Sequence, residues 1–218
     1  MNLLEFARGP AFNFALIVFV FGVVWRLAGL FLQWRRRDLS KPRQHNLIVA
    51  GTRAMLMRSL PPHELEKHIV FQHMSGYAWH ICWFISLLFF APHLPFFKQF
   101  LGFAWPALPN WISLGAGGVA LALLLSLVIR RATNPVLKQI STWDDYISVV
   151  LTILPLATGF LAYGRLLPIR YETLLALHLL SICTLLIWYP FGKLMHLFLT
   201  FPSRFQAGAL LGRKGVEA

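Results

Sequence analysis

The amino-acid sequence predicts an all-α polytopic membrane bundle of five transmembrane helices, and three observations lead to this fold class. The chain of 218 residues is 57% hydrophobic and only 13% charged, whereas a soluble domain is nearer half apolar and a quarter charged. Its mean hydropathy is +0.62, and the apolar residues form five blocks of roughly the 17 to 25 residues that a spanning helix needs. The blocks are apolar all round, unlike the alternating strands of a membrane β-barrel.

The five predicted spans belong to one domain, residues 1–218, without internal repeats. The first block is too long and too rich in aromatic residues and arginine for a cleaved signal peptide, so it is predicted to be retained. A basic connection at about 35–68 follows this span, and a tail at about 199–218 follows the fifth. The predicted spans are residues 12–34, 69–91, 111–129, 146–163 and 173–198.

Most basic side chains belong to one side of the predicted bundle, and the formal net charge is +12. By the positive-inside rule the N-terminus is outside and the C-terminus is cytoplasmic. The run WRRRD at 34–38 anchors the first span, and nucleic acid is not an expected partner. The basic residues assigned to the cytoplasmic side are Arg35, Arg36, Arg37, Lys41, Arg43, Arg53, Arg58, Lys67, Arg130, Arg131, Lys138, Arg204, Arg213 and Lys214.

The histidines are concentrated on two of the predicted spans. Of eight histidines, His45 and His63 lie in the polar connection as solvated residues, and His68 stands at the entrance of the second span. The other five lie on or directly beside the second and fifth spans. Ionisable groups inside a membrane are costly, so each is a functional candidate. These five are His73, His80, His93, His178 and His196.

Neutral imidazole is the usual axial ligand of haem iron, and two imidazoles from facing helices can bind one haem. Structural zinc usually gathers four ligands tightly, and proton relays usually include intramembrane Asp or Glu, so both fit less well. On a continuous helix the eighteen residues between His178 and His196 make five turns. Both rings would then share one face, roughly 27 Å apart.

Small residues next to the histidines leave room for a porphyrin edge. Gly76 lies four residues before His80, Gly192 lies four before His196, and Ser181 lies three after His178. Each small residue therefore shares the face of its histidine on a helix. Close helix packing explains small residues in membranes equally well.

The segment HLLSICTLLIWYPFGKLMH, residues 178–196, resembles the last span of the cytochrome b (gamma) subunit of respiratory nitrate reductase. Its histidine, aliphatic stretch, Pro-Phe, basic residue and second histidine follow that family's pattern. The wider family includes membrane subunits of sulfite-reductase-linked and heterodisulfide-reductase-like complexes. The resemblance implies a bacterial or archaeal inner-membrane protein with two b-type haems. Such a subunit passes electrons between membrane quinone and a cytoplasmic iron–sulfur partner, and is not a stand-alone enzyme.

In that family each haem takes one histidine from the second span and one from the fifth. The second span here departs from the family's ten-residue separation, because HMSGYAWHICWFISLLFFAPH separates its histidines by seven, thirteen and twenty residues. We predict that His80 pairs with His196 towards the cytoplasm and that His93 pairs with His178 towards the outside. His73 is the alternative to His80.

His80 and His93 lie on rather different faces of an ideal helix. Pro92 and Pro95 remove that difficulty if they end or bend the second span.

Four further cationic residues are candidate cofactor contacts. Lys98 could serve a quinone ring, and Arg165 and Arg170 could pair with haem propionates on the outer side, as could Lys193 on the inner side. Anchoring at the membrane interface explains each one as well.

STWDDY, residues 141–146, predicts a helix N-cap and not a catalytic pair. No phosphate-binding glycine loop, nucleophile elbow or metal-hydrolase motif is present. The alternative to a cytochrome is a cofactor-free membrane anchor or transporter subunit, whose histidines would be polar contacts within the bundle.

Overall fold

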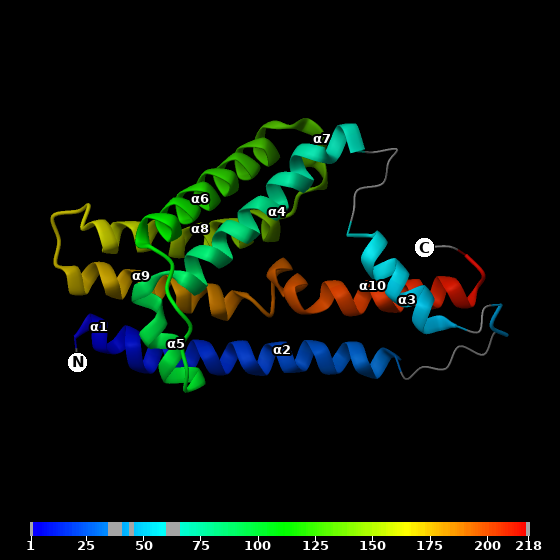
Figure 1. Cartoon of the computed structure of the whole chain (residues 1–218), viewed down its shortest axis with the longest axis horizontal. Coiled ribbons are helices and arrows are strands. Elements are labelled where there is room, and N and C mark those ends of the chain that lie inside the picture. The colour runs from blue at the N-terminus through cyan, green and yellow to red at the C-terminus, as the bar shows by residue number, and fades with distance from the viewer. Residues whose placement is uncertain (1, 35–40, 44–45, 60–65, 217–218) are drawn as a thin grey trace. The chain divides into compact units, whose positions relative to one another are not determined.

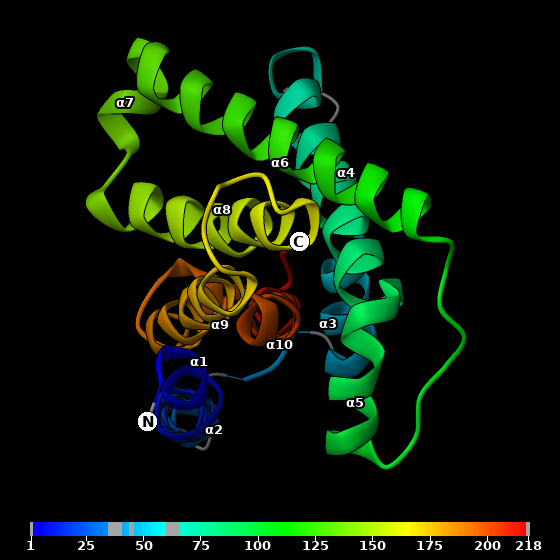
Figure 2. The same cartoon turned by 90° about the vertical axis from the view of Figure 1, so that its left-hand side faces the viewer.

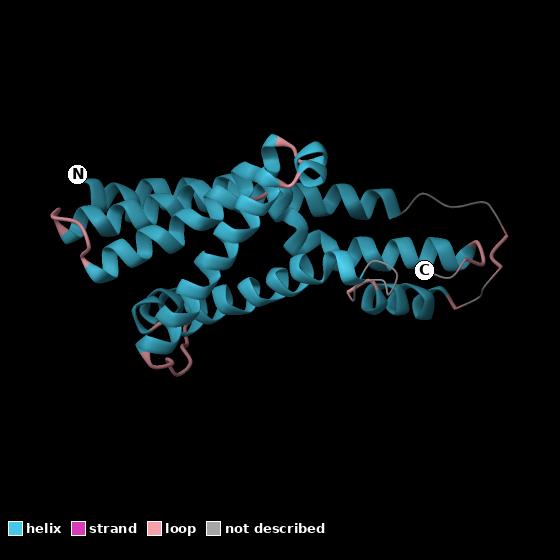
Figure 3. Cartoon of the chain, turned by 90° about the horizontal axis from the view of Figure 1, so that it is seen from above, coloured by secondary structure: helices cyan, strands magenta, loops and turns pink. Residues whose placement is uncertain are grey.

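The computed structural model describes residues 2–34, 41–43, 46–59 and 66–216, and these residues form helices and connections without any strand (Figures 1 and 3). The predicted all-α class is therefore confirmed. Arg35, Arg36, Arg37, His45 and His63 lie outside the described residues, as do the side chains of Lys67 and His68. The main helices are α2 (Phe12–Trp34), α3 (Leu47–Met57), α4 (Glu66–Phe89), α5 (Leu94–Leu101), α6 (Asn110–Thr133), α7 (Pro135–Ile140), α8 (Trp143–Gly164), α9 (Tyr171–Trp188) and α10 (His196–Arg213). Three short turns and a short helix complete the fold: α1 (Leu3–Phe6), η1 (Ala7–Ala11), η2 (Ala91–His93) and η3 (Lys193–Met195).

Four continuous helices are long and apolar enough to cross a membrane, and a bent pair forms a fifth candidate. The continuous ones are Leu3–Leu32, Asn110–Thr133, Trp143–Gly164 and Tyr171–Trp188. The bent pair is Ile69–Phe89 with Ala91–Leu101, whose axes differ by 59°. These helices indicate a multi-pass membrane protein. The orientation with an external N-terminus stays a prediction.

The helices divide into two compact units. The first unit is Met1–Phe12 with Val70–Leu185, and the second is Asn13–Ile69 with Leu186–Ala218. In the first unit α6 and α8 pack side by side, joined through the short α7 (Figure 2). The candidate site described below lies within this unit.

The bend after α4 is built by Pro92 and Pro95. Phe90 is extended (φ −76°, ψ 121°), and Pro92 and Pro95 occupy the first turns of η2 and α5, where a missing N–H costs nothing. The predicted bend is therefore confirmed.

Each carbonyl freed at the end of α4 receives its own donor. The Leu87 oxygen accepts from His93 Nδ1 at 2.9 Å, Leu88 from Trp105 Nε1 at 2.8 Å, and Phe89 from the Leu108 amide at 3.0 Å. The Phe90 oxygen accepts from the His93 amide at 2.9 Å. Lipid offers no hydrogen bonds, so a broken helix at membrane depth needs such internal partners.

The predicted fifth span is not one continuous helix. Helix α9 ends at Trp188, whose carbonyl accepts from the amides of Phe191 at 3.0 Å and Gly192 at 3.1 Å. Helix α10 begins only at His196, after the turn η3. Pro190 lacks an amide hydrogen and its ring disturbs the preceding turn, which ends the helix. The expectation that five regular turns place His178 and His196 on one face is therefore wrong.

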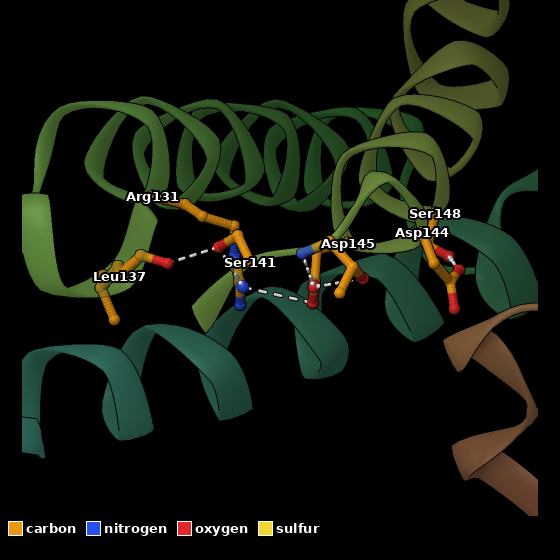
Figure 4. Close-up of polar contacts among 7 residues, drawn as sticks. Arg131, Leu137, Ser141, Asp144, Asp145 and Ser148 are labelled. Atoms are coloured by element: carbon orange, nitrogen blue, oxygen red, sulfur yellow. Dashed lines mark hydrogen bonds and ion pairs between the residues drawn. The ribbon is translucent and has the colours of Figure 1, made fainter. Parts of the chain in front are cut away.

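The start of α8 is capped as STWDDY predicts. Thr142 is the N-cap, and its amide and hydroxyl both donate to the Asp145 carboxylate, at 2.9 Å and 3.0 Å. Asp145 also forms an ion pair with Arg131 of α6 at 3.2 Å, and Arg131 donates to the Ser141 hydroxyl at 3.0 Å (Figure 4). One carboxylate therefore caps α8 and ties it to the end of α6. This is a structural role.

In the second unit, helices form in both the polar connection and the C-terminal tail. Helix α3 packs closely against α10 through small residues. A Cβ on Gly208 would collide with Cβ of Ala54 and lie 2.8 Å from the carbonyl oxygen of Ala50. Asn46 caps α3 by accepting from the Val49 amide at 3.2 Å. The backbone contact at Gly208 explains why α3 is stable although it is only 11 residues long.

We expect Gly208→Leu to destabilise the protein, because the leucine cannot fit between the two backbones. Overpacking of this kind costs about 1 to 3 kcal/mol or more. Thermal unfolding of the detergent-solubilised protein measures the loss as a lower midpoint. The matched control is Gly29→Leu on α2, where nothing lies within 4 Å of the added Cβ. Equal midpoints for the two variants would contradict this packing.

Candidate functional site

His93 and His178 lie next to each other in the first unit. Their ring centres are 6.2 Å apart and the ring planes differ by only 6°. His93 is the last residue of η2, at the bend between α4 and α5, and His178 lies in the middle of α9. The bend is what places His93 here, because helix α4 ends before it at Phe89. Both side chains are half-buried.

The tautomer of His93 follows from its hydrogen bond. Its Nδ1 lies 2.9 Å from the Leu87 carbonyl oxygen, which can only accept. Nδ1 therefore carries the proton, and Nε2 of the neutral ring keeps its lone pair. The edge of the His93 ring also packs against Phe90, with ring centres 5.1 Å apart and planes at 83°. The imidazole is thus held on one side by the backbone and on another by an aromatic ring.

His178 is held from helix α8. Its Nδ1 lies 3.2 Å from the Thr158 hydroxyl oxygen, which in turn lies 3.0 Å from the hydroxyl of Ser181. The Ser181 hydroxyl also donates to the backbone carbonyl of His178 at 2.6 Å. Ser181 was predicted as a small neighbour of His178, and the structure places its hydroxyl one hydrogen bond away from Thr158.

Gly159 of α8 provides the surface on which the His178 ring lies. A Cβ at this position would be 3.2 Å from Cε1 and 3.5 Å from Nδ1 of the ring. Any larger residue would therefore press on the imidazole. Thr158 and Gly159 were not among the predicted site residues. The signal that could have found them is PLATG, 155–159, where a hydroxyl and a glycine follow a proline inside an apolar span.

Two imidazoles in this arrangement match the donor set of one six-coordinate metal centre. A nitrogen ligand lies about 2 Å from a transition metal, so two on opposite sides place their ring centres roughly 6 Å apart. Among the described residues, Nε2 of neither ring has a hydrogen-bond partner. Within the same residues, no group of three or more His, Cys, Asp and Glu side chains could hold a metal ion. Two axial nitrogens suit an ion whose remaining ligands come from a macrocycle, which is the case for haem.

The other predicted histidine ligands have the same type of hydrogen bond. His80 bonds the Gly76 carbonyl through Nδ1, and His196 bonds the Lys193 carbonyl through Nδ1 at 2.8 Å. In both rings Nδ1 is therefore the protonated nitrogen. His73 lies edge-on to Tyr77, with ring centres 4.9 Å apart. The pairing of His196 with His80 or His73 stays a prediction.

Gly76 and Gly192 have different surroundings. Nothing lies within 4 Å of a Cβ built on Gly76, so the space next to it is open. Gly192 is buried and extended (φ −96°, ψ −177°) at the turn between α9 and η3. It therefore no longer shares a helical face with His196, which corrects the expectation from a continuous span.

The predicted cationic contacts lie at helix ends. Arg165 follows α8 in the left-handed conformation (φ 49°), and its guanidinium is 5.3 Å from the ring centre of Tyr171. The Arg170 carbonyl accepts from the first amides of α9, at 3.0 and 3.2 Å. Lys98 lies in the last turn of α5, and Lys193 begins η3. The contact between Arg165 and Tyr171 fits an interfacial anchor; contacts with a cofactor stay predictions.

Comparison with known proteins adds one relative. A protein from Nitratidesulfovibrio vulgaris, described only as "Protein", is 29% identical over 209 residues. The match covers 93% of this chain and 91% of that protein, so the two are similar along nearly their full length. No family model matches the chain, and no solved structure matches it.

Proposed function

We propose that this chain is a b-type membrane cytochrome, the electron-transferring subunit of a respiratory complex. The observation that carries the proposal is the pair of parallel imidazoles, His93 and His178, 6.2 Å apart between two helices of an apolar bundle. Nδ1 of His93 bonds a carbonyl, so its Nε2 keeps a lone pair, and the separation of the two rings would suit two nitrogen ligands of one iron. The resemblance of residues 178–196 to a cytochrome b subunit supports the same function.

The chain's own residues would hold and orient the group. His93 and His178 would be the axial ligands, Leu87 and Thr158 would fix their ring orientation through Nδ1, and Gly159 would leave room for the His178 ring. A haem bound by two histidines carries one electron reversibly without binding substrate. In a membrane, the apolar helices around the pair would exclude water.

The same proposal includes a second haem b. Its predicted ligands are His196 with His80 or His73, with Gly76 as a small neighbour. Each of His80 and His196 already donates Nδ1–H to a backbone carbonyl, which is the usual outer-shell arrangement of a metal-binding histidine. Two haems at different depths would carry electrons across the bacterial or archaeal inner membrane.

The proposed electron donor or acceptor in the lipid is a quinone, with Lys98 as a candidate hydrogen-bond donor. Arg165, Arg170 and Lys193 are candidate contacts for haem propionates, since charge-assisted bonds to carboxylates are strong. The proposed partner on the cytoplasmic side is an iron–sulfur subunit. The basic residues predicted on that side would favour an acidic docking face.

Reduction by a soluble quinol tests this function. We expect a short-chain quinol added to the purified, oxidised protein to produce the absorption of reduced haem b, and a quinone to reverse it. The matched control is His178→Ala, which should lose the part of the signal due to one haem. A colourless protein, or a haem that no quinol or quinone affects, would contradict the proposal. A colourless protein would favour the alternative function, a cofactor-free membrane anchor or transporter subunit.

A further inference from the structure

The hydroxyl oxygen of Thr158 on α8 lies 3.2 Å from Nδ1 of His178, within hydrogen-bond distance of the ring. We propose that Thr158 is a positioning residue: its oxygen accepts Nδ1–H of His178 and so keeps Nε2 unprotonated and available as a metal ligand. This inference rests on the proposed function for its purpose. The tautomer itself is a property of the chain alone.

The hydrogen bonds around Thr158 determine where the protons lie. The Thr158 oxygen lies 2.7 Å from the Leu154 carbonyl, 3.3 Å from the Pro155 carbonyl, 3.0 Å from Ser181 Oγ and 3.2 Å from His178 Nδ1. The Ser181 oxygen lies 2.6 Å from the His178 carbonyl. A carbonyl can only accept, and each hydroxyl has one proton to donate. When both hydroxyls donate to these carbonyls, every hydroxyl proton is used.

The contact between the two hydroxyls, at 3.0 Å, is then left without a proton, and the contact between Thr158 and His178 takes its proton from the ring. With Nδ1 protonated, the ring supplies it and all short contacts to carbonyls are kept. With Nε2 protonated, Thr158 must donate to Nδ1 and the Leu154 carbonyl loses its side-chain donor. The contacts to the two carbonyls are the shortest in this network, at 2.7 and 2.6 Å, so the arrangement that keeps both is preferred. The network therefore favours the Nδ1–H tautomer.

The local sequence explains how Thr158 reaches this position. Pro155 and Thr158 lie on one side of α8, and Gly159 follows directly. Because Gly159 has no side chain, the His178 ring can approach α8 to within 3.2 Å of where a Cβ would stand. A larger residue there would keep the ring away from the Thr158 hydroxyl. The arrangement thus requires Thr158 and Gly159 together.

Outer-shell acceptors of this kind orient a histidine ligand and raise its basicity, and their loss typically costs 10- to 100-fold in metal affinity. We therefore expect Thr158→Val, which removes the hydroxyl and keeps the shape, to weaken haem binding at this site by about tenfold or more. Thr158→Ser restores the hydroxyl and should restore binding. The matched control is Thr152→Val on the same helix, where the hydroxyl donates only to the Ser148 carbonyl at 2.8 Å.

The direct test is nitrogen NMR of the His178 ring in ¹⁵N-histidine-labelled protein prepared without haem, with the signal assigned by its loss in His178→Ala. Wild-type protein, Thr158→Ser and Thr152→Val should all show Nδ1 protonated and Nε2 unprotonated. In Thr158→Val the ratio of the Nδ1–H to the Nε2–H form should fall about tenfold, as expected for losing one hydrogen bond.

Two outcomes would overturn the inference. One is an Nε2-protonated His178 in the wild-type protein. The other is an unchanged ratio in Thr158→Val, which would mean that the Thr158 hydroxyl does not set the tautomer. Neither outcome depends on haem. If wild-type protein binds no haem but shows the expected tautomers, the proposed function fails and the role of Thr158 in holding the ring stands.

Discussion

Replacing His178 by alanine is expected to remove one of the two haems b and leave the other in place. The reason is geometric: the ring centres of His178 and His93 lie 6.2 Å apart, and the two rings are proposed to bind one iron. Removing either imidazole leaves an axial position without a protein nitrogen. Haem b is not covalently attached, so loss of a ligand should release it. Haem per chain, measured on purified protein by its pyridine complex, should fall from two to one.

His93→Ala should remove the same haem, and this makes the prediction specific. The two single variants and the double variant should all retain one haem with the same absorption and reduction potential, because ligands of one site do not act additively. His45→Ala and His63→Ala serve as controls and should keep both haems. Retention of both haems by His178→Ala would contradict the paired site. So would a double variant that loses a second haem which neither single variant loses.

Gly159→Leu is expected to prevent haem binding at the same site although neither histidine is replaced. The added Cβ alone would lie 3.2 Å from Cε1 of His178, and the rest of the leucine extends further into the space of the ring. The imidazole would have to turn away from Thr158 and from His93. We expect occupancy of this haem site to fall at least tenfold, since displacement of even one ångström disrupts a metal site. Haem per chain and the remaining reduction potential measure the loss.

Gly115→Leu is the matched control for this variant. Gly115 lies on α6, is exposed, and has nothing within 4 Å of an added Cβ. The Gly115→Leu variant should therefore keep both haems and the wild-type midpoint of thermal unfolding. Gly159→Leu should keep its helical circular dichroism, which separates loss of the site from loss of the fold. Full haem occupancy in Gly159→Leu would show that the His178 ring does not lie against α8.

The spans could be predicted from the sequence because composition alone identifies them. Blocks that are apolar all round have no other stable form in a bilayer than helices. Local chemistry also predicted the cap at Thr142 and the bend at Pro92 and Pro95. The break at Pro190 was missed because the apolar pattern continues across it to Phe198, and counting turns from His178 to His196 assumed an unbroken helix. Helix α3 was missed because its stability comes from packing against α10 at Gly208.

Of the candidate site, only the histidines could be predicted from the sequence. Histidine is costly in a membrane, so its concentration on two spans was visible without a structure. Thr158 and Gly159 could not be identified from the sequence, because their role depends on which face of α8 meets α9. Threonine bonding to its own helix and glycine in close packing are both common in membrane helices. The contact at 3.2 Å between Thr158 and His178 distinguishes them from those ordinary cases.

The measurement that tests the account most directly is a dithionite-reduced minus oxidised spectrum of the purified protein, with haem b quantified per chain. We expect the spectrum of bis-histidine haem b and two haems per chain. One haem, retained in His178→Ala, would contradict the site at His93 and His178. No haem, in protein made with an adequate haem supply, would contradict the cytochrome function altogether.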